Sequence, residues 1–396
     1  MRSLLGKLRL ASVEVTASHS PTDALWTFPA MIASAFVVAW GAEAAEFLVS
    51  QGLALAILAL IQTLPEFAVE AVIAWKAGKN PPMVHLAIAN FTGSLRLLTG
   101  LGWPMIYAVA AFYSRKTRGR KLGSIKLPDD HAIEVLGLLP PLSYFVVIWA
   151  KGNLSLVDAG ILTSTYVAYL WILLRLPPRA ETLEEDEEVP AVSRWALSFT
   201  GWKRWAAVGS LLLGGGAVIY FVAEPFLGSM LALAASFGMD QFVFIQWVAP
   251  FLSEFPEKTS AFAWARRVTR APVALMNMVS SNINQWGILS AMLAVIYCWS
   301  HGSTEPLPFD EFQRQEILLT IVQAFLGWIL LASMDFQAYE AAGLFALWLI
   351  QFAVPSARHP ILYVYLSWIL LEVGLILAGR KSLAAFPAFA RAWRRR

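Results

Sequence analysis

The sequence predicts an all-α polytopic membrane protein, and three observations lead to this fold class. The 396 residues are 58% hydrophobic and only 14% charged, which is more apolar than a water-soluble domain tolerates. Apolar stretches long enough to cross a bilayer recur along the chain, for example at 47–75 and 361–378. The two halves of the chain also repeat the same polar motifs. We therefore predict about 10 to 11 transmembrane helices in two inverted-topology repeats.

The predicted spans follow one another with short loops between most of them. They cover residues 25–49, 52–77, 83–112, 132–150, 154–176, 204–236, 241–265, 271–299, 315–333, 337–355 and 360–378. Residues 1–20 hold Arg and Lys but no apolar run, so we expect no cleavable signal sequence. The single cysteine, Cys298, excludes an intramolecular disulfide and a thiol metal cluster.

The predicted domain organisation has five parts. A segment at 1–24 precedes the first repeat at 25–176, an acidic cytoplasmic linker at 177–203 precedes the second repeat at 204–355, and 356–396 form an extra helix with a basic tail. The acidic run Glu184–Glu188 could bind cations, but a hydrated linker is the favoured interpretation.

Basic residues predict the orientation in the membrane. They gather in the loops at 115–126 and 266–270 and in the tail from Arg380 onwards, which we expect on the cytoplasmic side. The acidic loop at 305–311 then lies outside. These features predict a multi-pass protein of the inner (plasma) membrane, with Lys76, Lys79 and Arg358 as external exceptions.

Pro-Glu pairs mark corresponding places in the two repeats. Pro65-Glu66 lies in the second predicted span and Pro256-Glu257 in the seventh, so the two helices cross the bilayer in opposite directions. The flanking counterparts are Glu46 with Glu224, Asn90 with Asn277, and Ser94 with Ser281.

The Pro-Glu pairs predict a cation site in mid-membrane. A carboxylate there costs several kcal/mol unless it meets a cation, a proton or water. Proline has no N-H, so Pro65 and Pro256 free the carbonyls of Ile61 and Leu252 from the helix ladder. A hard cation prefers such a mixture of carboxylate and carbonyl oxygens. Protonated glutamates that bond between kinked helices are the structural alternative, which the duplication of the motif disfavours.

Further polar side chains share helix faces with these glutamates. Candidate cation ligands are Glu66, Glu257, Thr63, Ser253, Glu254, Asn90, Ser94, Asn277 and Ser281, and candidate proton or coupling sites are Glu70, Gln62 and Gln285. Glu46 and Glu224 could line an access route, although glutamates near helix ends often just reach the interface. His85 and His131 are isolated and favour packing over a metal site.

At these motifs the sequence resembles the calcium/cation antiporter superfamily, which includes the sodium/calcium exchangers and their cation/proton relatives. The first repeat has Ile61-Gln-Thr-Leu-Pro-Glu66 and Ala89-Asn-Phe-Thr-Gly-Ser94, and the second has Leu252-Ser-Glu-Phe-Pro-Glu257 and Met276-Asn-Met-Val-Ser-Ser-Asn282. The resemblance implies an exchanger fold, with Glu66 and Glu257 as the paired ion-binding carboxylates.

The motifs depart from the family pattern at several positions. Gln62 replaces a hydroxyl residue, Glu254 replaces a small one, and Glu70 is an additional acid. Leu98 stands where the family has Asn or Asp, and Gln285 stands at the matching place in the second repeat. Sodium coupling and calcium selectivity therefore do not follow from the resemblance.

Arg96 is a cation in the middle of a predicted span. It lies well around the helix from Ser94, so we expect an ion pair with Glu43, Glu46 or Glu70. One hypothesis is that Arg96 stands in for a bound cation. The other is a structural ion pair off the pathway.

The predicted function is secondary antiport of a divalent cation, Ca²⁺ or similar, against H⁺ or Na⁺ at Glu66 and Glu257. The partners are inorganic cations and membrane lipid, with no cofactor and no nucleic acid. A non-transporting sensor or scaffold with the exchanger fold is the alternative, motivated by Arg96 and the altered motifs. An intramembrane enzyme is disfavoured because the sequence has no nucleophile-base pair, metal-binding His pair or phosphate loop.

Overall fold

A computed structural model describes residues 20–46, 48, 60, 63–175 and 190–394, which form two compact units. Unit 1 comprises the described residues of Met1–Asn90, Leu170–Glu257 and Trp299–Gly302. Unit 2 comprises those of Phe91–Tyr169, Lys258–Cys298 and Ser303–Arg396. Each unit contains residues from both halves of the sequence. The compact units therefore do not coincide with the two predicted repeats, each of which lies within one half.

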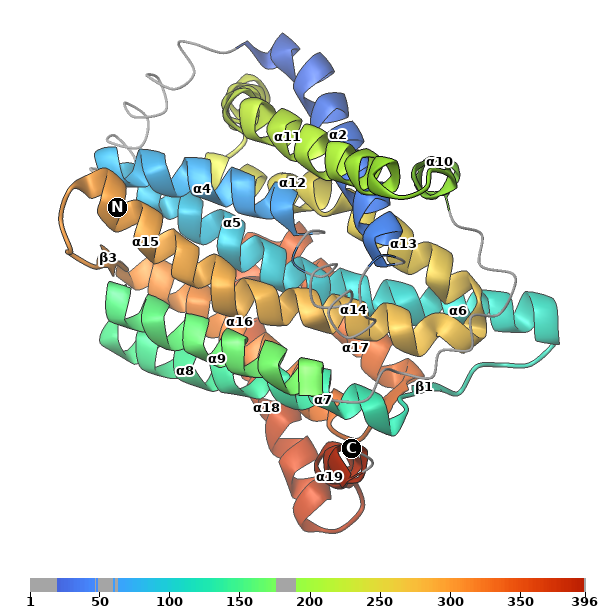
Figure 1. The fold of residues 1–396 in the computed structure, drawn as a ribbon. Helices are drawn as coiled ribbons and strands as arrows, with labels where there is room; N and C mark the ends of the chain where they lie inside the picture. Colours follow the sequence, from blue (N-terminus) through green and yellow to red (C-terminus); the bar gives the residue numbers. More distant parts are fainter. Residues whose placement is uncertain (1–19, 47, 49–59, 61–62, 176–189, 395–396) are drawn as a thin grey trace. The chain divides into compact units, whose positions relative to one another are not determined.

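Unit 1 is built around two long helices, α2 and α11, which run side by side (Figure 1). Its elements are η1 (Pro21–Asp23), α2 (Ala24–Glu46), α4 (Leu64–Lys79), η2 (Pro81–Met83), α10 (Ala191–Ser198), α11 (Trp202–Ser236) and α12 (Gln241–Ser253). Helices α5 (Val84–Leu97) and α13 (Phe255–Arg266) begin in this unit and continue in unit 2. Helix α12 packs against α2, α4 and α11.

Small residues let the backbones of α2 and α11 approach closely. A Cβ atom at Gly215 would lie 2.7 Å from Val38 Cγ2 and 3.1 Å from the Ser34 carbonyl oxygen. A hydrogen bond of 2.8 Å joins the hydroxyls of Thr27 and Ser229. Close packing and interhelical hydrogen bonds drive helix association in lipid, where the hydrophobic effect is absent.

Unit 2 holds the remaining helices and two short antiparallel ladders. The helices are α6 (Trp103–Arg118), η4 (Asp129–His131), α7 (Ala132–Gly137), α8 (Leu139–Lys151), α9 (Leu156–Arg175), η5 (Val268–Arg270), α14 (Ala271–Asn284), α15 (Ser290–His301), α16 (Glu311–Leu331), α17 (Ala338–Ala353), η7 (Pro355–Ala357), α18 (Arg358–Leu377) and α19 (Ala385–Arg394), of which α9 and α15 end in unit 1. Strand β1 (Ser124–Lys126) pairs with β4 (Asp335–Gln337), and β2 (Asn153–Leu154) pairs with β3 (Leu307–Pro308).

Local signals explain several helix ends. Gly119, with φ of 62°, ends α6 directly after a basic last turn, and Gly152, with φ of 75°, ends α8. Both conformations favour glycine. Helix α16 begins at a capping box in which Asp310 accepts from the Gln313 backbone at 2.8 Å and Gln313 accepts from the Asp310 backbone at 3.1 Å.

Two π-helical segments mark matching places in the two halves. Segment η3 (Leu98–Gly102) joins α5 to α6, and η6 (Gln285–Leu289) joins α14 to α15. Each segment begins eight residues after its motif asparagine, Asn90 or Asn277. Such π-bulges are rare in helices and often occur near functional sites. The repeat seen in the sequence is therefore present in the backbone as well.

Arg96 lies in a buried polar network of unit 2. Its Nη2 is 2.5 Å from Glu316 Oε2, and Arg358 Nη1 lies 3.0 Å from the other oxygen of the same carboxylate. Arg96 Nη1 also donates to Gln351 at 3.2 Å, and Gln351 donates to Tyr365 at 2.7 Å. The sequence had offered Glu43, Glu46 or Glu70 as partners, so Glu316 is an unforeseen one.

The helical prediction agrees with the structure along the described chain. Seven helical segments there are long and apolar enough to cross a membrane, and Gln241–Ser253 and Ala338–Ala353 are shorter apolar helices. The short ladders β1–β4 and β2–β3 were not predicted, because strands of two or three residues carry too little pattern to be recognised. Gln62, Ile61 and the acidic run Glu184–Glu188 lie outside the described residues.

The close approach of α2 and α11 predicts different effects for two neighbouring glycines. Gly215→Ala should lower the melting temperature of the detergent-purified protein, because the new methyl meets Val38 and the Ser34 backbone, and overpacking costs about 1–3 kcal/mol. Gly216 has nothing within 4 Å of its Cβ position, so Gly216→Ala should leave the melting temperature equal or higher. Equal melting of the two variants would contradict the packing.

Candidate functional site

Both Pro-Glu pairs occupy the first turn of a helix. Helix α4 starts at Leu64, so Pro65 and Glu66 are its second and third residues. Helix α12 ends at Ser253, and α13 starts at Phe255, which gives Pro256 and Glu257 the same positions. Proline is tolerated there because first-turn N-H groups lack intrahelical partners. The predicted span at 241–265 is thus divided at Glu254, which lies between α12 and α13.

Glu66 and Glu70 are joined by one amide in unit 1. Asn90 Nδ2 donates to Glu66 Oε1 at 2.9 Å and to Glu70 Oε2 at 2.6 Å. All three side chains are buried, with Glu70 and Asn90 fully inaccessible. Glu66 and Glu70 are four residues apart on α4, which places them on the same helix face. Two acids are thus held close together away from water.

Ser253 connects the end of α12 to the same carboxylate. Its Oγ donates to Glu66 Oε2 at 2.6 Å and lies 3.0 Å from the Ala249 carbonyl oxygen. Thr63 lies at the N-cap of α4, where its hydroxyl donates to the Leu60 carbonyl at 2.9 Å. Unit 1 therefore brings an amide group from α5 and a hydroxyl from the α12 terminus to Glu66.

The acids of unit 1 are numerous and deeply buried. Glu66, Glu70, Glu254 and Glu257 are each at most 2% exposed. Ionised carboxylates at this burial cost several kcal/mol each unless a cation or proton compensates them. The N-terminal turns of α4 and α13 favour negative charge on Glu66 and Glu257, but by about 2 kcal/mol at most. The helix ends alone do not offset the burial of these charges.

Two oxygens of this cluster have no hydrogen-bond donor among the described residues. They are Glu70 Oε1 and Asn90 Oδ1, both inaccessible to solvent. Such atoms suit a hard cation, which takes carboxylate and amide oxygens as ligands. Among the described residues, no three His, Cys, Asp or Glu side chains are grouped closely enough to hold a metal by themselves. A bound ion would thus also need amide, hydroxyl or backbone oxygens.

The other predicted site residues are distributed differently. Ser94, Asn277, Ser281 and Gln285 belong to unit 2, where all but the half-buried Asn277 are buried, and their role in ion binding stays a prediction. Glu224 on α11 lies 2.8 Å from Lys76 on α4, a contact that was not foreseen. The side chain of Glu46 lies outside the described residues.

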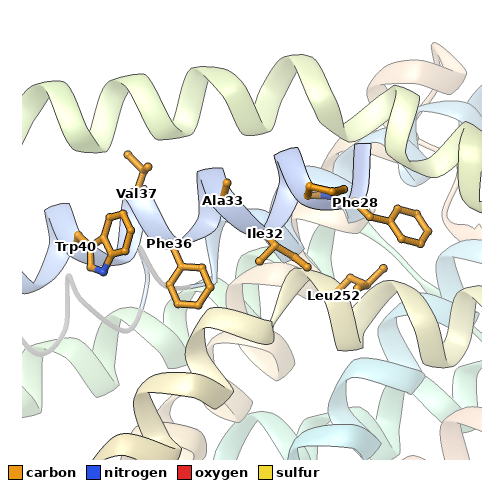
Figure 2. A pocket seen from close by; sticks show the side chains of 8 residues that line it. Phe28, Ile32, Ala33, Phe36, Val37, Trp40 and Leu252 are labelled. Carbon is orange, nitrogen blue, oxygen red and sulfur yellow. The ribbon is translucent and has the colours of Figure 1, made fainter. Parts of the chain in front are cut away.

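A separate apolar pocket in unit 1 does not resemble an ion site. It measures about 640 Å³ and is lined by α2 residues from Phe28 to Trp40 and by Leu252 of α12 (Figure 2). Phe28, Ile32 and Phe36 present hydrocarbon to it. With so little oxygen in its lining, it cannot replace the hydration shell of a cation. The cluster around Glu66 is therefore the stronger candidate.

Comparison with known proteins bears on the fold as a whole. One family model, described as sodium/calcium exchanger protein, matches residues 24–175 and also residues 208–355. The chain belongs to this family. The exchanger fold with two inverted-topology repeats, predicted from the Pro-Glu motifs, is thereby confirmed together with its multi-pass membrane character. A comparison with curated protein sequences gives no significant match.

Several solved structures resemble the chain over most of its length. The crystal structure of the H⁺/Ca²⁺ exchanger CAX is 30% identical, with a TM-score of 0.83, and the match covers 99% of this chain and 97% of that one. A sodium-calcium exchanger, NCX_Mj, is 17% identical with a TM-score of 0.55 over 86% and 99% of the two chains. The native structure of YfkE is 16% identical with a TM-score of 0.59 over 88% and 97%.

The double hydrogen bond from Asn90 predicts a specific weakness. Asn90→Asp removes both donors and sets a third carboxylate beside Glu66 and Glu70. The free energy of unfolding should fall by about 1–3 kcal/mol for each lost hydrogen-bond partner, and the melting temperature in detergent should fall with it. The loss should be larger at pH 8 than at pH 6, because protonation relieves the repulsion. Asn80→Asp, between α4 and η2 where the asparagine side chain makes no capping hydrogen bond, is the matched control. Equal melting of the two variants at both pH values would refute the bridging role.

Proposed function

We propose that the protein is a secondary antiporter that exchanges a divalent cation, Ca²⁺ or a similar ion, for protons at a buried site that includes Glu66 and Glu70, with Glu257 as the matching carboxylate of the second repeat. The observation that carries the proposal is the Glu66–Asn90–Glu70 arrangement, in which two acids share one amide and leave two buried oxygens open. Family membership supports cation antiport in general.

Electrostatics gives exchange a simple basis. Two ionised carboxylates neutralise one divalent cation, so the loaded site is close to neutral and can change its access from one side of the membrane to the other. An empty site with both acids ionised is too costly to reorient within hydrocarbon. The acids must therefore hold either the substrate ion or its exchange partners at each step.

An additional acid favours protons as the exchange partner. One divalent ion balances the charges of Glu66 and Glu257, and unit 1 also buries Glu70, whose Oε1 has no hydrogen-bond partner among the described residues. Each further acid stays buried at low cost if it carries a proton, which needs no ligand shell. Sodium would need several positioned oxygens, and Gln62 and Leu98 replace side chains that supply them in the family. The relative at 30% identity is described as an H⁺/Ca²⁺ exchanger, which supports the same choice.

The sensor or scaffold alternative loses part of its motivation. That hypothesis rested on Arg96 as a built-in cation that occupies a vacant acidic site. In the structure Arg96 compensates Glu316 at 2.5 Å, within a network that also includes Arg358. Because the Arg96 guanidinium pairs with Glu316, the contact supports a structural role for Arg96 rather than the role of a built-in substitute for the transported cation.

The site assignment predicts a loss of transport on removal of either motif carboxylate. Glu66→Gln and Glu257→Gln should each abolish Ca²⁺ flux into proteoliposomes while the yield of folded protein stays near that of the wild type, because each removes one charge without changing shape. Glu311→Gln, on the exposed first turn of α16, is the matched control and should transport normally. Wild-type flux in either motif variant would refute the assignment.

The choice of coupling ion has its own test. Ca²⁺ uptake into liposomes should be driven by an outward proton gradient and not by an outward sodium gradient at constant pH. Glu70→Gln should retain some Ca²⁺ flux but weaken its dependence on the proton gradient, because one proton-carrying acid is lost. Uptake driven by sodium alone would reject proton coupling and leave Glu66 and Glu257 as the cation site.

A further inference from the structure

The C-terminal helix α19 has three chemically distinct faces. Ala385, Ala388 and Ala392 are buried and face α7 and η4, against which the helix packs (Figure 1). An aromatic face includes Phe386, which is 46% exposed, and the stacked rings of Phe389 and Trp393. A basic face holds Arg391 and Arg394. Such a helix has an apolar and a cationic side besides the one that docks on the protein.

Three ion pairs hold this helix in place. Lys381, in the turn before α19, lies 2.7 Å from Glu340 and 2.9 Å from Glu372, both of which are buried. Arg391 forms a bidentate pair with Asp129, with both distances at 2.7 Å. Bidentate pairing fixes orientation as well as distance. Ion pairs thus attach α19 to other residues of unit 2 both just before its first turn and in its last turn.

The remaining cations of this segment have no acidic partner among the described residues. Arg380 and Arg394 are solvent-exposed, and neither forms an ion pair there. The sequence continues with Arg395 and Arg396. Since α19 follows the spanning helix α18 after a short turn, these charges lie close to the end of a span. The surface beside the end of a span is made of phospholipid headgroups.

We propose that α19 is an interfacial helix that binds anionic phospholipid headgroups, with Arg380 and Arg394 at the phosphates and Phe386 among the upper acyl chains. Amphipathic helices that carry aromatic and basic residues lie parallel to the membrane, at the boundary between headgroups and acyl chains. Cytoplasmic leaflets are anionic, and each nearby Lys or Arg adds to the attraction. Arg394 lies on the same short helix as the exposed Phe386, and Arg380 lies in the turn before it. Anionic lipid complements this combination of charge and apolar surface, whereas water or a neutral lipid does not.

The test uses the full-length protein with a fluorescent probe on α19. Ala390, which is exposed on this helix, is replaced by Cys in a Cys298→Ser background and labelled with an environment-sensitive dye. The protein is placed in vesicles that contain brominated phosphatidylglycerol or brominated phosphatidylcholine at equal mole fraction. We expect quenching by the anionic lipid to exceed that by the neutral lipid by about twofold or more. The same dye at Thr304→Cys, in an exposed polar loop, should show little quenching by either lipid.

Charge variants decide whether recognition is local. Arg380→Gln with Arg394→Gln should bring the two quenching values together, whereas the equal charge loss in Arg118→Gln with Arg120→Gln, on the exposed end of α6 and its loop, should not. Absence of quenching at Ala390→Cys by both lipids would overturn the interfacial position. Equal quenching by both lipids in the unmodified background, or equal effects of the two double variants, would overturn headgroup recognition by α19. None of these outcomes depends on ion transport.

Discussion

Compensation of buried charge is the constraint on which this structure depends. A carboxylate or guanidinium surrounded by helices in a bilayer costs several kcal/mol unless an opposite charge or a proton accompanies it. The protein meets this constraint in two ways. In unit 2 the compensation is internal, because Glu316 receives both Arg96 and Arg358. Around Glu66 and Glu70 the contacts include an amide and a hydroxyl, which stabilise negative charge without cancelling it. Neutral donors of this kind can remain in place whether the acids hold a cation or a proton.

The network around Arg96 shows how internal compensation builds the fold. Arg96 comes from α5, Glu316 and Gln323 from α16, Gln351 from α17, and Arg358 and Tyr365 from α18. Gln351 donates to Gln323 at 3.2 Å, and Gln323 in turn donates to the Arg96 carbonyl at 3.1 Å, so the polar groups close into a ring. Such a network is stable when every member is satisfied, and removing one charge leaves another buried alone. It therefore fastens four helices to one another at a fixed rotation.

Sequence alone predicted the helices and the grouping of Asn90 and Ser253 with Glu66, but not the partner of Arg96. Apolar length sets the spans, and the Pro-Glu pairs are recognisable because proline and a mid-membrane acid are each costly in a helix. The division of the predicted span 241–265 at Glu254 could not be located from the sequence, since a proline allows either a kink or an interruption. The pairing of Arg96 with Glu316 was missed because their separation in sequence is 220 residues, and periodicity within one helix cannot assign such a contact. Glu316 lies at the start of a predicted span, where an acid is easily taken for an interfacial one.

The two repeats have matching backbone features but different side chains at several positions. The shared features indicate what the fold requires, and the differing side chains are those that the fold does not require. Both Pro-Glu pairs begin a helix, and both π-helical segments begin eight residues after the motif asparagine. Segment η3 begins with Leu98 and η6 with Gln285, so this distortion does not need a polar residue at its start. By contrast, Glu70 of the first repeat corresponds to the buried Ala261 in the second. Since the backbone tolerates this asymmetry, the fold does not require Glu70, and the additional acid beside Asn90 is free to serve the proposed exchange of protons.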